Sequence, residues 1–215
     1  MDMPATQLWS VRTGRERLDS QTRAALISAA KLTFSQLGYA RTTVADITER
    51  AEVSRATFYV YFASKDEVFR VLTERLRNAF LEAQQAPGAG REDPAAVATA
   101  AVTGFVDVYA DNLAFITVLE HQALTDEELR SMWQEIRERL LRRMTRFVRR
   151  LVSEGIAHPV APPDMVATAV SGMAVRFAPL IAANPAERPQ IMGHLVRLYL
   201  QALGIDKWPG HEATS

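Results

Sequence analysis

The spacing of apolar residues along the chain is the feature that most constrains how it folds. Between residues 125 and 155, apolar side chains recur at steps of three, four and seven residues, which places them on one face of an α-helix. The members of this stripe are Leu129, Trp133, Ile136, Leu140, Met144, Phe147 and Leu151. Most other segments show a similar spacing, and no convincing alternation of apolar and polar residues indicates a β-strand. The sequence therefore predicts an all-α fold.

Capping residues, prolines and glycines divide the sequence into about nine helices. Ser64–Glu67 and Thr125–Glu128 each have the form of a capping box, and Asp93 supplies an N-cap that is followed by proline. Gly155 and Gly204 are natural helix stops. The expected helices cover roughly residues 21–37, 44–51, 55–62, 65–85, 94–110, 112–124, 125–154, 164–183 and 190–203.

Composition excludes several kinds of site. The 215 residues contain no cysteine, so a disulfide framework, a thiol nucleophile and a thiolate metal site are all excluded. The four histidines are far apart and lack metal-ligand spacing, so we assign neither a metal nor another cofactor. No nucleophile–base arrangement stands out, and we predict no catalytic residues and no enzyme.

Neither a membrane span nor a secretory signal is recognisable in the sequence. No uninterrupted apolar stretch reaches the roughly eighteen residues that a bilayer requires. Residues 1–17 carry charges throughout and contain no apolar core of the kind that a signal peptide has. We therefore expect a cytoplasmic protein without a membrane partner.

Charge is unevenly distributed along a chain whose net charge is zero. Between Arg12 and Lys65 there are nine lysines and arginines against five acids, whereas the remainder is slightly acidic. This asymmetry indicates a polyanionic partner at one end of the chain. A solvated basic face without any partner is the alternative interpretation.

Residues 41–65 are the most informative segment. Two helices as short as those expected here bury too little surface to be stable alone, so they must pack on a neighbour. Thr43 and Ser54 are good N-caps for them, and Phe58 and Phe62 lie four positions apart on the inward face. Helical geometry then turns the other side chains of the second helix partly or wholly outward, namely Arg55, Thr57, Tyr59, Val60 and Tyr61.

An exposed helix of this composition suits a DNA groove. Arg55 can bond the edge of a guanine, and Thr57 can contact a thymine methyl group or a phosphate. The hydroxyls of the two tyrosines can donate to phosphate oxygens. Lys65 lies at the start of the next helix, where free backbone N–H groups also favour an anion.

Residues 42–47 and 51–66 resemble the DNA-binding signature of the tetracycline-repressor (TetR) family, within a similar stretch from about residue 24 to residue 69. The resemblance implies a helix-turn-helix in which Thr42 and Thr43 meet phosphate groups and Lys65 binds another phosphate. It also implies a recognition helix that begins after Ser54 and presents the groove-facing residues Arg55, Ala56, Thr57, Tyr59, Val60 and Tyr61.

Two departures from the family pattern bear on this interpretation. Glu52 occupies a turn position where the family usually has glycine, so the turn is expected to be altered and an acid to lie near DNA. Val44 and Val60 are aliphatic where some members carry base-reading polar groups. Arg55 is therefore expected to supply more of the direct readout.

The resemblance also implies how the whole chain is organised. We expect a flexible basic N-terminal arm over 1–19, a three-helix DNA-binding domain over 20–66, an effector-binding and dimerisation domain over 67–205, and a tail over 206–215. The basic arm either lies along the DNA or is a disordered tail.

Aromatic and methionine side chains recur on helical faces from residue 105 onward. Each of them can be ordinary core, or together they can line a pocket between helices, as the family's effector cavity implies. The candidate ligand-binding residues are Phe105, Tyr109, Trp133, Met144, Phe147, Met173 and Phe177. Such a pocket favours an apolar or aromatic ligand, with Tyr109, His121 or Arg176 as a polar anchor.

The expected function is that of a ligand-responsive repressor that binds a palindromic, double-stranded DNA operator as a homodimer. In the family, the last two long helices pair with those of a second subunit. Here these helices carry the apolar residues Val166, Val170, Ala174, Leu195, Leu198, Tyr199 and Ala202. One alternative is a DNA-binding regulator with a filled core and no ligand. Another is a helical small-molecule-binding protein or enzyme that does not bind DNA.

Overall fold

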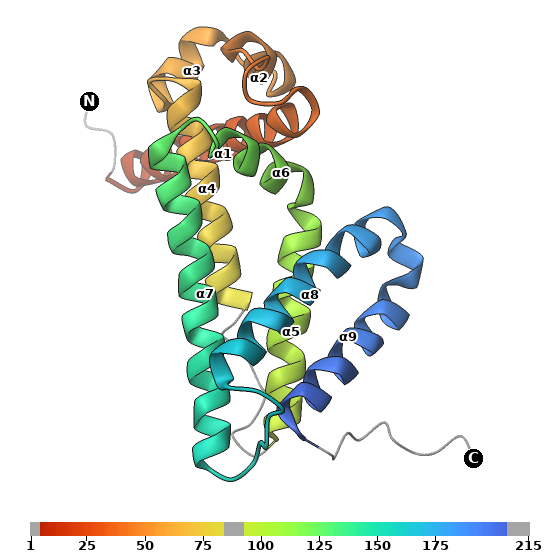
Figure 1. Ribbon diagram of the computed structural model, residues 1–215. Helices are drawn as coiled ribbons and strands as arrows, with labels where there is room; N and C mark the ends of the chain where they lie inside the picture. The colour runs from red at the N-terminus through yellow and green to blue at the C-terminus, as the bar shows by residue number, and fades with distance from the viewer. Residues whose placement is uncertain (1–4, 84–92, 206–215) are drawn as a thin grey trace, which may run out of the picture. The chain divides into compact units, whose positions relative to one another are not determined.

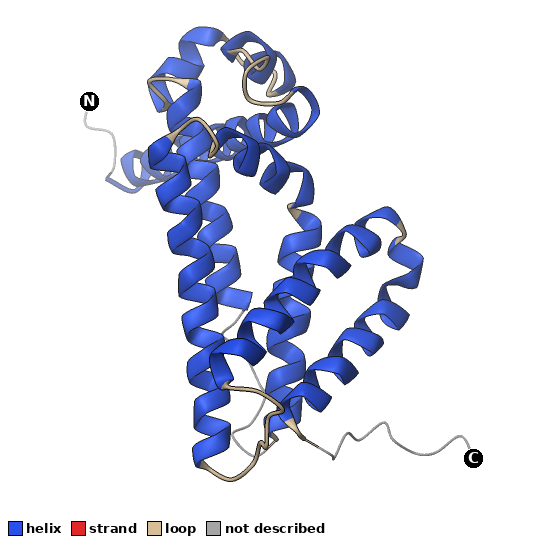
Figure 2. Ribbon diagram, viewed as in Figure 1, coloured by secondary structure: helices blue, strands red, loops and turns tan. Residues whose placement is uncertain are grey.

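The computed structural model describes residues 5–83 and 93–205, with side chains from residue 19 onward. All elements in these ranges are helical (Figure 2). The α-helices are α1 (Ala5–Leu37), α2 (Val44–Arg50), α3 (Arg55–Tyr61), α4 (Lys65–Ala83), α5 (Pro94–Asp111), α6 (Leu113–Gln122), α7 (Glu127–Ser153), α8 (Pro163–Ala183) and α9 (Arg188–Leu203). A 3₁₀ turn over Pro185–Glu187 precedes α9. The predicted all-α fold is confirmed.

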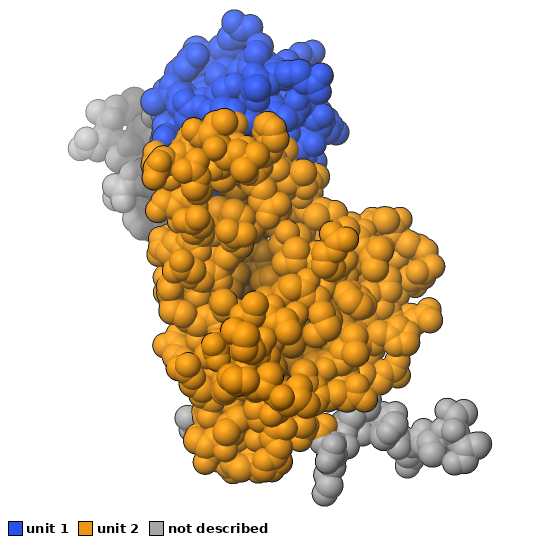
Figure 3. All heavy atoms as spheres, in the orientation of Figure 1, with its two compact units in different colours: residues 1–74 blue, residues 75–215 orange. Residues whose placement is uncertain are grey.

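The chain divides into two compact units, residues 1–74 and 75–215 (Figure 3). The division falls inside α4, whereas we predicted a domain boundary after residue 66, near the first residue of this helix. The helix α4 therefore begins in the first unit and ends in the second. The predicted tail over 206–215 lies outside the described residues.

Helix α1 is longer than the sequence pattern predicted. It has 33 residues and begins at Ala5, whereas we expected its first turn near residue 21. No proline interrupts Ala5–Leu37, and the single Gly14 weakens a helix without ending it. The backbone over most of the predicted arm is thus helical, and the flexibility of this segment stays a prediction. A contact between this segment and DNA stays a prediction.

The first unit is built around an aromatic and aliphatic core that holds the two short helices in place. The large core side chains that are at most 2% exposed include Leu26, Ile27, Phe34, Ile47, Phe58, Phe62 and Phe69. Phe69 of α4 packs edge-on against the rings of Phe34 and Tyr39, with centroid distances of 5.0 Å in both pairs. The predicted inward direction of Phe58 and Phe62 is confirmed. Their burial explains how helices too short to be stable alone are retained.

Helix α8 is a core helix of the second unit, where it packs against α5, α7 and α9 (Figure 1). By length and composition it could cross a membrane, and it alone among the described helices passes this test unaided. Val166, Val170 and Ala174 are at most 3% exposed within the chain itself. Its apolar composition is therefore explained by contacts with three neighbouring helices.

Helix α7 follows its predicted stripe in the first half and departs from it in the second. Leu129, Trp133, Ile136, Leu140 and Leu151 are buried as expected, but Thr145 and Val148 are buried in place of Met144 and Phe147. Met144 is half-buried, and its sulfur lies 4.0 Å from the Ser171 hydroxyl of α8. The N-cap is Asp126, which accepts the Leu129 N–H at 3.0 Å, rather than the predicted Thr125.

Two glycines mark close approaches of backbone in the second unit. A Cβ on Gly104 of α5 would lie 2.9 Å from the carbonyl oxygen of Ala83, so α4 and α5 cross closely at this point. Gly204 ends α9 in the left-handed region, with φ of 64°, and a Cβ there would clash with the carbonyl oxygen of His158. The loop between α7 and α8 therefore closes over the end of α9.

Candidate nucleic-acid interface and ligand cavity

Helix α2 is positioned by a reciprocal capping box. Thr43 accepts the Asp46 N–H at 3.2 Å through its hydroxyl oxygen, and the Asp46 carboxylate accepts the Thr43 N–H at 2.8 Å. The Thr43 hydroxyl also donates to this carboxylate at 2.7 Å. These bonds lower the pKa of Asp46, with the side-chain bond from Thr43 as the largest cause. The predicted capping role of Thr43 is confirmed.

The turn between α2 and α3 is a Schellman motif with glutamate in the left-handed position. Glu52 has φ of 53° and is the one non-glycine residue with positive φ in the described part of the chain. The Val53 N–H donates to the Thr48 carbonyl at 3.0 Å, and the Glu52 N–H donates to the Glu49 carbonyl at 3.2 Å. The turn thus keeps its geometry without glycine, and an exposed carboxylate lies just before α3.

Helix α3 presents a polar and aromatic face to solvent. Ser54 caps it by accepting the Thr57 N–H at 3.0 Å, while Phe58 is fully buried and fixes its rotation. On the opposite side Tyr59 is 59% and Val60 76% exposed, and Arg55 and Ala56 are also exposed. Thr57 is half-buried, and its hydroxyl lies 2.9 Å from that of Ser54. The helix therefore offers Arg55, Tyr59 and Val60 most freely to a partner.

Three residues that were predicted to contact phosphate or to face the groove form hydrogen bonds within the first unit instead, namely Thr42, Tyr61 and Lys65. Thr42 is 1% exposed and donates to the Gly38 carbonyl at 2.8 Å, so its hydroxyl cannot reach a phosphate as expected. Tyr61 is half-buried and donates to Asp19 at 3.0 Å, and desolvation together with this bond raises its pKa. Lys65 has the most contacts of the three.

The Lys65 ammonium connects the start of α4 to the loop after α1. It donates to the carbonyls of Tyr39 and Thr42 at 3.0 and 2.9 Å, and it lies 4.5 Å from the centre of the Tyr39 ring. An ammonium has three donors, so one N–H is left for a phosphate. Lys65 thus holds the loop that precedes α2 while one of its donors remains usable.

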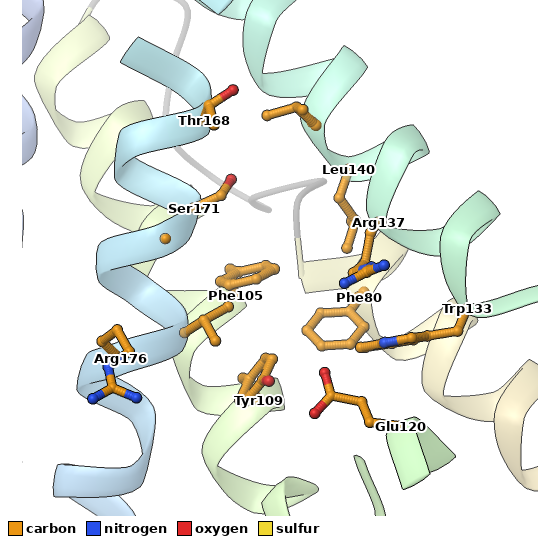
Figure 4. Close-up of a pocket in the computed structure, with 13 residues that line it drawn as sticks. Phe80, Phe105, Tyr109, Glu120, Trp133, Arg137, Leu140, Thr168, Ser171 and Arg176 are labelled. Carbon is orange, nitrogen blue, oxygen red and sulfur yellow. The ribbon is translucent and has the colours of Figure 1, made fainter. Parts of the chain in front are cut away.

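A cavity of about 420 Å³ lies within the second unit, between α4, α5, α6, α7 and α8 (Figure 4). Buried rings form much of its wall, namely Phe80, Phe105, Tyr109 and Trp133. Three exposed charged residues also line it, namely Glu120, Arg137 and Arg176. Its size falls within the roughly 300–1,000 Å³ that is typical of sites for small organic molecules.

The cavity brings together part of the predicted ligand-binding set. Phe105, Tyr109 and Trp133 line it, whereas the half-buried residues Met144, Phe147, Met173 and Phe177 do not. Of the suggested anchors, Tyr109 and Arg176 line the cavity and His121 does not. The residues that sequence reasoning missed are Phe80, Glu120, Arg137, Leu140, Leu141, Thr168, Ser171, Gly172 and Val175. Glycine and single charges carry no apolar periodicity, so their place in the lining leaves no signal in the sequence.

Tyr109 is a neutral hydrogen-bonding group in the cavity wall. Burial is the largest cause that raises its pKa, to about 12, and the nearby Glu120 raises it further while Arg137 opposes this effect. The phenol therefore stays protonated at neutral pH and can donate a hydrogen bond to a bound molecule.

The fold and this site define a helix-turn-helix protein with a cavity-bearing helical body. Residues 26–72 match the family model described as bacterial regulatory proteins, tetR family. Over residues 26–72 the chain is therefore similar to the tetR family of bacterial regulatory proteins.

Two curated transcriptional regulators match part of the chain. The transcriptional regulator TtgR of Pseudomonas putida is 45% identical over 56 residues, which is 26% of this chain and 27% of TtgR. The regulator TcmR of Streptomyces glaucescens is 39% identical over 94 residues, 43% of this chain and 41% of TcmR. The chain thus matches less than half the length of each of these relatives.

Solved structures extend the similarity in fold across most of the chain. A tetR-family regulatory protein from Rhodococcus RHA1 has a TM-score of 0.72 at 20% identity, covering 86% of this chain and 98% of its own. The tetR-family regulator PfmR of Thermus thermophilus has a TM-score of 0.67 at 20% identity, covering 86% and 99%. At this level of identity the similarity shows a shared fold.

Proposed function

We propose that this protein is a cytoplasmic transcriptional repressor that binds a palindromic DNA operator as a homodimer and responds to a small aromatic effector. The observation that carries the proposal is the exposed face of α3, where Arg55, Tyr59 and Val60 project from a capped helix anchored by Phe58. The length and rotation of α3 suit insertion into a major groove of DNA. In this arrangement α2, the first helix of the helix-turn-helix, crosses the DNA backbone.

Each exposed group on α3 suits one kind of DNA contact. Arg55 in the first turn can make a bidentate contact to guanine, which is worth about 1–3 kcal/mol of discrimination. The Tyr59 hydroxyl can donate to a phosphate, and Val60 can pack against a thymine methyl group. Thr43 and the remaining donor of Lys65 provide two further phosphate contacts from neighbouring elements.

Dimerisation through α8 and α9 is supported by apolar side chains that their own chain leaves uncovered. Met165 and Leu180 of α8 are 53% and 54% exposed, and Leu198 of α9 is 42% exposed. Of the apolar residues named above for pairing, Leu198 is exposed, whereas Val166, Val170, Ala174, Leu195 and Tyr199 form the core within the chain. A dimer interface on these two helices therefore uses a different face from the one that the sequence spacing indicated.

The cavity supports an effector-responsive regulator over one with a filled core. Helix α4 carries Lys65 in its first turn and Phe80, a cavity-lining residue, near its end. A ligand that contacts Phe80 differently in two conformations would shift α4 and change DNA affinity, and such coupling typically amounts to about 1–3 kcal/mol.

Fluorescence anisotropy with duplex DNA from upstream of the protein's own gene tests this function. We expect Tyr59→Ala to weaken binding about tenfold on every sequence, because a bond to a charged phosphate is lost. Arg139→Ala is the matched control, since it removes an exposed charge from α7 in the second unit and should leave affinity unchanged. Wild-type affinity should fall steeply with salt, and a salt slope near zero would contradict DNA binding.

A further inference from the structure

The cavity contains a buried hydrogen-bond donor without an acceptor. Trp133 is 4% exposed, and its Nε1 has no hydrogen-bond partner among the described residues. An unsatisfied buried donor costs roughly 1–3 kcal/mol, so such groups usually have a role that supplies a partner. Trp133 lines the cavity, and in Figure 4 its ring lies beside Phe80 and Glu120 at one end of it.

The other polar groups around the cavity are mostly donors as well. The Tyr109 phenol is protonated at neutral pH, and the guanidinium groups of Arg137 and Arg176 have donors but no acceptor. The Thr168 hydroxyl is an exception, because it already donates to the Asp164 carbonyl at 2.8 Å and can therefore only accept from a ligand. Glu120 is the one carboxylate among the described residues of the lining. A molecule that complements this wall must therefore supply acceptors.

The aromatic part of the lining indicates a flat ligand. Phe80, Phe105 and Tyr109 form a cluster of rings with centroid distances of 5.2–6.3 Å, against which a planar aromatic molecule can stack.

A ring cluster beside a carboxylate can also bind a cation. Here, however, the Arg137 guanidinium already lies 5.7 Å from the centre of the Trp133 ring. Among the described residues of the lining, Arg137 and Arg176 outnumber Glu120, and this net positive charge repels a further cation.

We propose that the cavity binds a planar aromatic molecule of neutral or negative charge whose ring ketone oxygen accepts the Trp133 Nε1–H. This inference rests on the proposed effector role of the cavity and specifies the chemical class of the effector. The donor is then satisfied only in the occupied state, so ligands that lack this oxygen leave it unpaired and bind less tightly.

Isothermal titration calorimetry on the full chain without DNA tests the proposal with two matched probes. Anthraquinone-2-carboxylate and anthracene-2-carboxylate share a ring skeleton and a charged group and differ in the two ketone oxygens. We expect the quinone to bind wild-type protein at least tenfold more tightly, and Trp133→Phe to remove this preference while the anthracene affinity stays within about twofold. N-methylacridinium, a cation of similar shape, should bind more weakly than either.

Two further measurements keep the result interpretable. A Cβ on Gly172, in the lining, would meet no atom within 4 Å, so Gly172→Leu should fold and should block both probes by filling the cavity. In case Trp133→Phe fails to fold, the indole N–H resonance of Trp133 in ¹⁵N-labelled wild-type protein should move downfield with the quinone and not with the anthracene. Trp9→Phe and Trp208→Phe assign this resonance, because the chain has three tryptophans.

Several results would overturn the proposal. The proposal fails if the two carboxylate probes bind wild-type protein with equal affinity, or if Trp133→Phe weakens the binding of both probes equally. It also fails if the cation binds most tightly or if no probe binds. Loss of operator binding measured without probe would contradict the proposed DNA-binding function instead, so the two failures are distinguishable.

Discussion

Replacing Glu52 by glycine should stabilise the protein, although it removes a side chain from an ordered turn. Glu52 holds φ of 53° because the Schellman motif that ends α2 requires a left-handed residue at this position. The Glu52 side chain is exposed, and no ion pair or side-chain hydrogen bond of this residue is recorded in the described structure. The substitution therefore changes backbone strain and one surface charge.

The expected gain is the difference between two opposing effects. A non-glycine residue in the left-handed region costs about 1–2 kcal/mol. Glycine makes the unfolded chain more flexible, which returns about 0.4–1 kcal/mol of this gain. The net increase in the free energy of unfolding therefore lies between about 0 and 1.6 kcal/mol, and its midpoint of about 0.8 kcal/mol corresponds to a rise of roughly 2–3 °C in Tm for a chain of this size.

Thermal unfolding followed by circular dichroism at fixed protein concentration measures this change. Glu52→Gln is the matched control, because it removes the charge and keeps the strained backbone, so its Tm should stay near the wild-type value. Glu52→Asn should recover part of the gain, since asparagine tolerates this conformation. A Glu52→Gly variant that melts with or below Glu52→Gln would refute the strain argument. DNA affinity should rise equally in the glycine and glutamine variants, because both remove the same acid.

Three other substitutions test separate parts of the structure. Gly104→Ala should lower the free energy of unfolding by about 1–3 kcal/mol in urea titration, because its Cβ would lie 2.9 Å from the Ala83 carbonyl oxygen; equal or higher stability would contradict the close helix crossing. Ser54→Ala should cost about 1 kcal/mol through loss of the α3 cap and should weaken DNA binding in anisotropy, and unchanged values of both would exclude a capping role. Asp46→Asn should be less stable than wild type at pH 7. Because the folded-state pKa of Asp46 lies below its ordinary 3.8, this difference should be fully present above pH 3.8 and vanish as the pH falls through the folded-state pKa; a difference that is constant down to the lowest pH measured would contradict the capping box.

The sequence predicts the helices well because their signals are local. Caps, prolines and glycines fix where most helices begin and end, and the structure agrees to within a few residues for α2 to α9. The start of α1 was missed because the segment before residue 21 has no strong apolar periodicity, so nothing in the pattern distinguishes a helix from a tail there.

The recognition helix was predictable, while the contacts that involve distant residues were not. Helical geometry and one buried phenylalanine are enough to place Arg55, Tyr59 and Val60 outside. By contrast, Tyr61 meets Asp19 across 42 positions of sequence, and Lys65 meets Tyr39 across 26. Such pairings depend on the packed arrangement of α1 and the loop after it, which periodicity does not encode.

The same limit applies to the cavity and to the apolar faces of α8 and α9. Periodicity identifies apolar faces but does not say whether a face covers the chain's own core, a ligand or a second subunit. Val166 and Met144 illustrate this, because the first is buried within the chain and the second lies outside the cavity lining.

Selection of preferred sequences from a random duplex library tests the central claim most directly. If α3 enters the major groove in a symmetric dimer, wild-type protein should enrich inverted half-sites with a defined spacing. Arg55→Ala should then lose its preference at a single position of each half-site and keep the others. Enrichment of no sequence by the wild type, or an unaltered preference in Arg55→Ala, would contradict the account.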